Sequence, residues 1–343
     1  MKIIKYLLLI ILISGLAWGL FFFIKPSTEK NQSEIQPETY PEQNELVQNA
    51  KKPEEHPDSI PAMSEKEYHG SDLKLEKVLE DNASYARYSI SYLSEGFKIS
   101  GIMNIPKGAG PFPVLILNHG YIDPKFYTNG QGLKREQDFF ARHGYAVLHS
   151  DYRNYAQSDF DPQNEIRPRS GYVEDVINAI EAVKKSDLQV FDKENIGMLG
   201  HSMGGGIALN VMVIKPDIAK AYVLLAPINS DYKVNFDKWV RSDWSDTARE
   251  FIEKYGEPQE NPELWDSLSA KNYFYRVSSP VMLHQGTADD QVPVEWSREL
   301  DEMLKKENKA ITYYEYPGES HTFTSAQNLV MQRTLEFLDS RLK

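Results

Sequence analysis

The chain has 343 residues, of which 41% are hydrophobic and 26% charged, so it is long enough for one large folded domain with additional segments. Its formal net charge of −12 argues against a nucleic-acid partner, because binding to phosphate backbones depends on Lys and Arg. The chain contains no cysteine, which excludes disulfides, zinc–thiolate sites, iron–sulfur clusters and a cysteine nucleophile.

The first predicted element is a membrane anchor at residues 1–25. Lys2 and Lys5 precede an uncharged stretch over residues 6–24, which as a helix would be about 28 Å long, close to the thickness of a bilayer core. A cleaved signal peptide has a shorter apolar core of about 7–15 residues, so we expect the helix to be retained, with secretion as the alternative. The basic residues before the helix favour an extracytoplasmic position, at the cell surface, for the rest of the chain.

Residues 26–67 change to a composition rich in Glu, Gln, Asn, Pro, Ser and Lys, with few large apolar side chains. Such a stretch buries too little surface to offset the loss of chain entropy, so we predict a flexible linker. The folded domain is predicted to occupy residues 68–343.

Within this domain, apolar runs that are typical of strands alternate with segments whose apolar residues recur at helical spacing. We expect strands at residues 85–92, 97–105, 113–118, 145–149, 195–199, 221–225, 281–284 and 311–316. We expect helices at residues 133–143, 173–185, 205–214, 294–306 and 329–342. This order implies an α/β fold with a mostly parallel sheet, helices on both faces and an antiparallel start.

A Gly-x-Ser-x-Gly pattern at residues 200–204 follows one of these strands and precedes an apolar helix. A serine on so sharp a strand-to-helix turn has a strained backbone, and glycine two positions away on either side avoids collisions with the turn. The pattern therefore predicts that Ser202 projects from the carboxyl edge of the sheet as a nucleophile.

A serine nucleophile needs a base, and the base needs a carboxylate that orients it. Asp289 and Asp290 follow the strand at 281–284, and His321 follows the last strand. We favour Asp289, because Asp290 could face solvent or cap the next helix. The chain order Ser202, Asp289, His321 is the one expected of α/β-hydrolases.

Acyl transfer also needs N–H donors for the developing oxyanion. The Met203 amide lies at the helix N-terminus that follows the serine, and the Tyr121 amide follows the strand at 113–118. We predict these two amides as the oxyanion hole. The alternative is that His119 and Gly120 merely form a turn.

Residues 229–279 interrupt the alternation with a Trp- and Tyr-rich, acidic segment. The segment follows a strand's carboxyl end, so we expect it to lie over the site as a cap. Its aromatic side chains, among them Trp239, Trp244 and Trp265, either line a pocket or form the core of the cap itself.

From about Ala83 to its end, the chain resembles the α/β-hydrolase superfamily, and within it the catalytic domain of prolyl oligopeptidases and dienelactone-hydrolase-like esterases. The likeness is carried by four stretches in the expected order, at residues 118–120, 144–153, 200–205 and 286–293. It implies Ser202 as nucleophile, Asp289 as orienting acid and His321 as base, with neither a metal nor an organic cofactor. Residues 151–153 resemble a structural strand end.

Two features depart from this family. Large prolyl oligopeptidases carry a β-propeller before the hydrolase domain, and the 67 residues before position 68 are too few to form one. Thr322 follows the predicted base, where a glycine is common in the family.

The sequence thus predicts a membrane-anchored serine hydrolase that cleaves small carboxylic esters through an acyl-enzyme. One alternative is a prolyl oligopeptidase-like peptidase that acts on short peptides. A second is a non-catalytic binding protein with a hydrolase fold.

Overall fold

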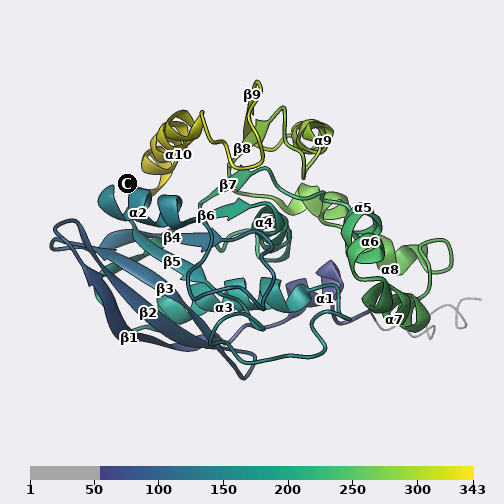
Figure 1. Cartoon of the computed structure of the whole chain (residues 1–343), viewed down its shortest axis with the longest axis horizontal. Coiled ribbons are helices and arrows are strands. Elements are labelled where there is room, and N and C mark those ends of the chain that lie inside the picture. The colour runs from purple at the N-terminus through teal and green to yellow at the C-terminus, as the bar shows by residue number, and fades with distance from the viewer. Residues whose placement is uncertain (1–54) are drawn as a thin grey trace, which may run out of the picture. The chain divides into compact units, whose positions relative to one another are not determined.

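The computed structural model describes residues 55–343, whose strands form one nine-stranded sheet in the order β1-β2-β3-β5-β4-β6-β7-β8-β9 (Figure 1). The strands are β1 (Ser71–Asp81), β2 (Tyr85–Ser94), β3 (Phe97–Pro106), β4 (Phe112–Asn118), β5 (Ala146–Ser150), β6 (Phe191–His201), β7 (Ala221–Leu225), β8 (Val281–Gly286) and β9 (Ile311–Tyr316). The strands from β5 to β9 in this order pair in parallel, and β1, β2 and β3 add an antiparallel extension. The predicted mostly parallel sheet is confirmed.

Helices cover both faces of this sheet, as predicted (Figure 1). The core on one face includes α1 (Ile60–Glu65), α3 (Ser170–Lys185), α4 (Met203–Ile214) and α9 (Val294–Lys306), and that on the other includes α2 (Lys134–Arg142) and α10 (Gln327–Leu342). Val114 and Ile116 of β4 join the first core, whereas Leu115 and Leu117 join the second. A strand buried on both faces has no polar side, which explains its unbroken apolar sequence.

Residues 229–279 form a set of short helices after β7. They are α5 (Tyr232–Asn235), the π-helix η1 (Phe236–Val240), α6 (Arg241–Asp243), α7 (Ser245–Tyr255), α8 (Pro262–Ser267) and the 3₁₀ helix η2 (Ala270–Arg276). Phe236, Phe251 and Trp265 are buried together in a small core of this segment, which is hereafter called the cap. Trp239 and Trp244 lie outside that core and line a cavity, as do Phe236 and Phe251 of the core.

The fold begins before the predicted boundary at residue 68. The side chains of Ile60 and Met63 in α1 are buried in the main core, and the Tyr68 hydroxyl donates to the carbonyl of Met63. The helix was missed because its few apolar residues lie in a polar, proline-containing stretch. β1 was missed because nearly all of its side chains are charged or exposed on the sheet edge.

The predicted membrane anchor at residues 1–25 and most of the predicted linker lie outside the described residues. Within residues 55–343, no helix has the length and apolar character that a membrane span requires.

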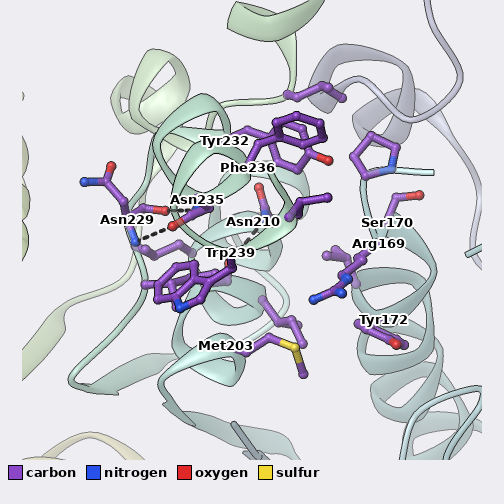
Figure 2. Close-up of a pocket in the computed structure, with 18 of the residues that line it drawn as sticks. Arg169, Ser170, Tyr172, Met203, Asn210, Asn229, Tyr232, Asn235, Phe236 and Trp239 are labelled. Atoms are coloured by element: carbon purple, nitrogen blue, oxygen red, sulfur yellow. Dashed lines mark hydrogen bonds between the residues drawn. The ribbon is translucent and has the colours of Figure 1, made fainter. Parts of the chain in front are cut away.

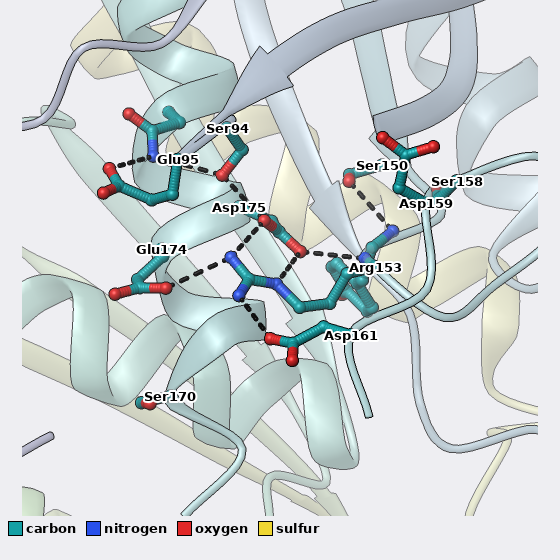
Figure 3. Close-up of polar contacts among 12 residues, drawn as sticks. Ser94, Glu95, Ser150, Arg153, Ser158, Asp159, Asp161, Ser170, Glu174 and Asp175 are labelled. Carbon is teal, nitrogen blue, oxygen red and sulfur yellow. Dashed lines mark hydrogen bonds and ion pairs between the residues drawn. The ribbon is translucent and has the colours of Figure 1, made fainter. Parts of the chain in front are cut away.

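A buried arginine joins the loop after β5 to α3 (Figure 3). The Arg153 guanidinium donates twice to Asp175, at 2.8 and 3.1 Å, and also to Asp161 at 3.0 Å and Glu174 at 3.1 Å. Its backbone amide donates to Asp175 as well. These bonds compensate the burial of charge and fix the N-terminal half of α3 against the sheet. Arg153 is thus a structural residue in this network.

Candidate active site

Ser202 lies between β6 and α4, with φ 56° and ψ −120°. This positive φ is unfavourable for a side-chain-bearing residue and is enforced by close packing of the turn. A Cβ on Gly200 would lie 2.2 Å from the Gly204 carbonyl oxygen, and a Cβ on Gly204 would lie 2.0 Å from the Asn118 carbonyl oxygen. Both positions therefore require glycine, and the tight turn holds Ser202 at the carboxyl edge of the sheet.

His321 and Asp289 meet at the same edge, in the loops after β9 and β8. The Nδ1 of His321 donates to Oδ2 of Asp289 over 2.7 Å, and both side chains are almost completely buried. The other candidate, Asp290, is exposed and makes no hydrogen bond to the histidine. The structure therefore pairs His321 with the acid that the sequence favoured.

Three further donors hold the Asp289 carboxylate. The Gln285 side chain donates to Oδ2 at 2.9 Å, and the backbone amides of Gln291 and Val292 each donate to Oδ1 at 2.9 Å. Burial alone would raise the pKa of Asp289, but the hydrogen bonds from His321 and these amides lower it below its usual value. The carboxylate is thus ionised near neutral pH and suited to orient the histidine.

The nucleophile and the base line one cavity of about 440 Å³, together with Gly120 and Tyr121. No hydrogen bond joins Ser202 Oγ to the His321 ring in the described structure. Catalytic hydrogen bonds are often long in a free enzyme and shorten when substrate binds. The structure thus brings the three predicted residues to one site, with the hydrogen bond between Ser202 and His321 not formed.

The two predicted oxyanion donors flank Ser202. Met203 begins α4, and the first amides of a helix have no acceptor within the helix. Gly120 packs so closely that a Cβ there would lie 3.1 Å from Ser202 Cβ, which brings the neighbouring Tyr121 to the nucleophile. Neither the Met203 nor the Tyr121 amide donates to an acceptor within residues 55–343. Both are therefore available to a ligand.

Three residues that support this site were not predicted. His201 Nε2 donates to the His321 carbonyl at 3.0 Å, and Arg135 donates to the Thr322 carbonyl at 3.2 Å. Gln285 binds Asp289, as described above. A sequence signal existed only for His201, which occupies the x position before the serine.

A second cavity of about 470 Å³ extends from Ser202 beneath the cap (Figure 2). Arg169 and Tyr172 lie on the side opposite Trp239, and Phe236 lies at the cap end (Figure 2). Arg169 is paired with Glu165 at 2.9 Å and stacks on Trp244, with 4.5 Å between the guanidinium carbon and the ring centre. This cavity offers space for a substrate next to the nucleophile.

No group of three or more acidic or histidine side chains in the described residues could hold a metal ion.

Comparisons with known proteins show the family to which the chain belongs. Residues 131–343 match the prolyl oligopeptidase family. The uncharacterized peptidase YuxL of Bacillus subtilis is 25% identical over 296 residues, which cover 83% of this chain and 43% of that protein. Dipeptidyl aminopeptidase BIII of Pseudoxanthomonas mexicana is 24% identical over 233 residues, or 66% of this chain and 32% of that protein. The chain thus spans less than half the length of these two relatives.

Among solved structures, an acetyl xylan esterase from Paenibacillus sp. R4 superposes with a TM-score of 0.63 at 19% identity, covering 88% of this chain and 99% of the esterase. This likeness establishes the fold of the chain and not its substrate.

Proposed function

Because the chain belongs to the prolyl oligopeptidase family and is therefore a serine hydrolase, we propose that Ser202, Asp289 and His321 form its catalytic triad and that it cleaves carboxylic esters. The observation that carries this proposal is the 2.7 Å hydrogen bond between His321 and Asp289, at the sheet edge where Ser202 projects. That bond orients the imidazole and leaves Nε2 for the serine.

In the acylation half, Nε2 of His321 takes the hydroxyl proton while Ser202 Oγ forms a bond to the ester carbonyl carbon. The carbonyl electron pair moves to the oxygen, and the Met203 and Tyr121 amides donate to the resulting oxyanion. When the carbonyl re-forms, the bond to the alkoxy oxygen breaks, and the proton on His321 passes to the leaving alcohol. The products of this half are the alcohol and an acyl-serine.

Water completes the reaction by the same steps. His321 accepts a proton from water while the oxygen of that water bonds to the acyl carbon. When the bond between the acyl carbon and Ser202 Oγ breaks, His321 gives the proton to Oγ. The carboxylic acid leaves and the free enzyme is regenerated.

Hydrolysis of short peptides is the second candidate, because relatives of this chain are named as peptidases. The preference for esters rests on the cavity under the cap, whose lining is more apolar than polar and includes a stripe of apolar side chains on α4. A peptide brings an N–H and a C=O per residue, each of which needs a partner when buried.

The test is labelling of the full-length chain with a fluorophosphonate probe, which reacts with activated serines. Wild type and a Ser340→Ala control should be labelled, and Ser202→Ala should not. A folded wild type without labelling would instead support the non-catalytic binding protein. Turnover of p-nitrophenyl butyrate against proline-containing peptide amides then separates an esterase from a peptidase.

We also propose that residues 1–25 hold the protein in a membrane, with the catalytic domain on the extracytoplasmic side, on the basis of the apolar stretch at 6–24. Protease added to intact cells should remove the domain, while a secreted form would appear in the medium.

A further inference from the structure

The cavity beneath the cap follows one face of α4. Met203, Ile207, Asn210 and Ile214 all line it, at spacings of four, three and four residues, which places them in one stripe along the helix. From the nucleophile end at Met203 to the far end at Ile214, this stripe is roughly 16 Å long. The cavity is therefore an elongated channel that begins beside Ser202.

Four buried aliphatic side chains line this channel away from Ser202. Ile60 and Met63 of α1, Val173 of α3 and Ile214 of α4 all line it, and each is at most 4% exposed. These residues are enclosed by protein and offer no hydrogen-bonding group to a ligand. The polar residues beside α1, Asp58, Arg167 and Ser170, are bonded to one another, so the part of a ligand that contacts the four aliphatic side chains should be apolar.

Four charged side chains of the lining are paired with one another, and the others, Lys238, Asp243 and Asp290, belong to the cap and to the loop after β8 rather than to α4. The Arg167 guanidinium binds Asp58, and Arg169 binds Glu165. On the α4 stripe the polar side chain is Asn210, whose Nδ2 donates to the Gly206 carbonyl at 3.2 Å. A peptide that lay along the aliphatic stripe would find few partners there for its backbone groups.

From these contacts we infer that the channel along α4 binds the straight acyl chain of the ester, so that the substrates are esters of medium-length fatty acids. This inference rests on the proposed function, because it requires an acyl group attached to Ser202. α1 then sets the maximum chain length, since its Ile60 and Met63 line the channel away from Ser202.

The test measures kcat/KM of the full-length chain on p-nitrophenyl acetate, butyrate, hexanoate, octanoate and decanoate. Burial of each added methylene should raise kcat/KM by about fourfold until the channel is full. If kcat/KM does not change with chain length, or falls steadily from butyrate onward, the inference is overturned.

Two variants at the far end should change the maximum acyl-chain length in opposite directions. Ile214→Phe shortens the channel, so the ratio of octanoate to acetate activity should fall at least tenfold. Met63→Ala lengthens it and should raise the ratio of decanoate to octanoate activity. The second variant keeps the test decisive if the phenylalanine cannot be accommodated by the fold. Leu335→Phe in α10, on the other face of the sheet, is the control and should change neither ratio.

The outcomes separate the two proposals. If Ser202 is not labelled by fluorophosphonate and no ester is turned over, the proposed function fails. If esters are hydrolysed through Ser202 but the far-end variants leave both ratios unchanged, only the acyl-chain channel is refuted.

Discussion

The ring of His201 holds the loop that carries His321, because its Nε2 donates to the His321 carbonyl at 3.0 Å and the two rings lie 4.5 Å apart between centres. His201 immediately precedes Ser202, so this contact connects the turn of the nucleophile to the loop of the base. Burial, and the neighbouring His321, lower the pKa of His201 to about 4. The ring is therefore neutral at pH 7 and acts as a positioning residue.

Replacement of His201 by Ala should lower kcat by about 10- to 100-fold with little change in KM, because His321 loses its fixed position relative to Ser202. His201→Gln keeps a side-chain N–H and should recover part of this loss. The measurement is steady-state turnover of p-nitrophenyl butyrate, with the exposed His143→Ala as control. A change in thermal stability alone, with kcat intact, would contradict the positioning role.

Asp289→Asn should lower kcat by about 10³- to 10⁴-fold. The neutral asparagine amide, unlike the carboxylate, neither stabilises the charged imidazole nor fixes its tautomer. Asp290→Asn is a matched control, since the adjacent carboxylate is exposed and should change kcat by less than about twofold. Equal losses in the two variants would show that the acid of the triad has been misassigned.

The low pKa values of two buried histidines lead us to expect a loss of stability in mild acid. Burial lowers the pKa of His201 to about 4, and burial with the nearby Arg333 lowers that of His284 to about 3, from an ordinary value of 6.5. Below 6.5 the unfolded chain takes up protons that the folded chain does not, so the free energy of unfolding falls as the pH falls from 6.5 toward 4. At pH 5 each histidine should contribute a loss of about 2 kcal/mol.

Urea unfolding at pH 7.5 and pH 5 measures this loss. In His284→Gln the loss between the two pH values should be smaller by about 2 kcal/mol, because one titrating group has been removed. If wild type and variant lose the same free energy, His284 is not buried as a neutral ring.

The parts of the fold that follow from local pattern could be predicted from the sequence. β4 has no polar side because both of its faces are covered, and the glycines around Ser202 mark a turn that admits no other residue. The order of strands then brings Asp289 and His321 to the same edge. By contrast, α1 and the charged edge strand β1 carry too few apolar residues to be recognised by periodicity.

Contacts between distant segments could not be predicted in this way. The bond from Gln285 to Asp289 and the bond from His201 to the His321 loop depend on how turns pack at the sheet edge. The same holds for α1, whose Ile60 and Met63 line the cavity although they lie far from Ser202 in the chain. No period or motif in the sequence encodes such neighbours.

A buried ion pair is one of the contacts that position α1. Asp58, just before the helix, accepts from Nε of Arg167 at 2.9 Å and from the Ser170 hydroxyl at 2.6 Å, and its side chain is only 2% exposed. Asp58→Ala leaves Arg167 without this partner and should lower the free energy of unfolding by about 3 kcal/mol. Glu253→Ala, which removes an exposed partner of Arg249, should cost less than about 0.5 kcal/mol in the same urea titration. If the two variants are equally stable, α1 is not held by Asp58 but by its other contacts, among them the bond from Lys215 to the Ser64 carbonyl.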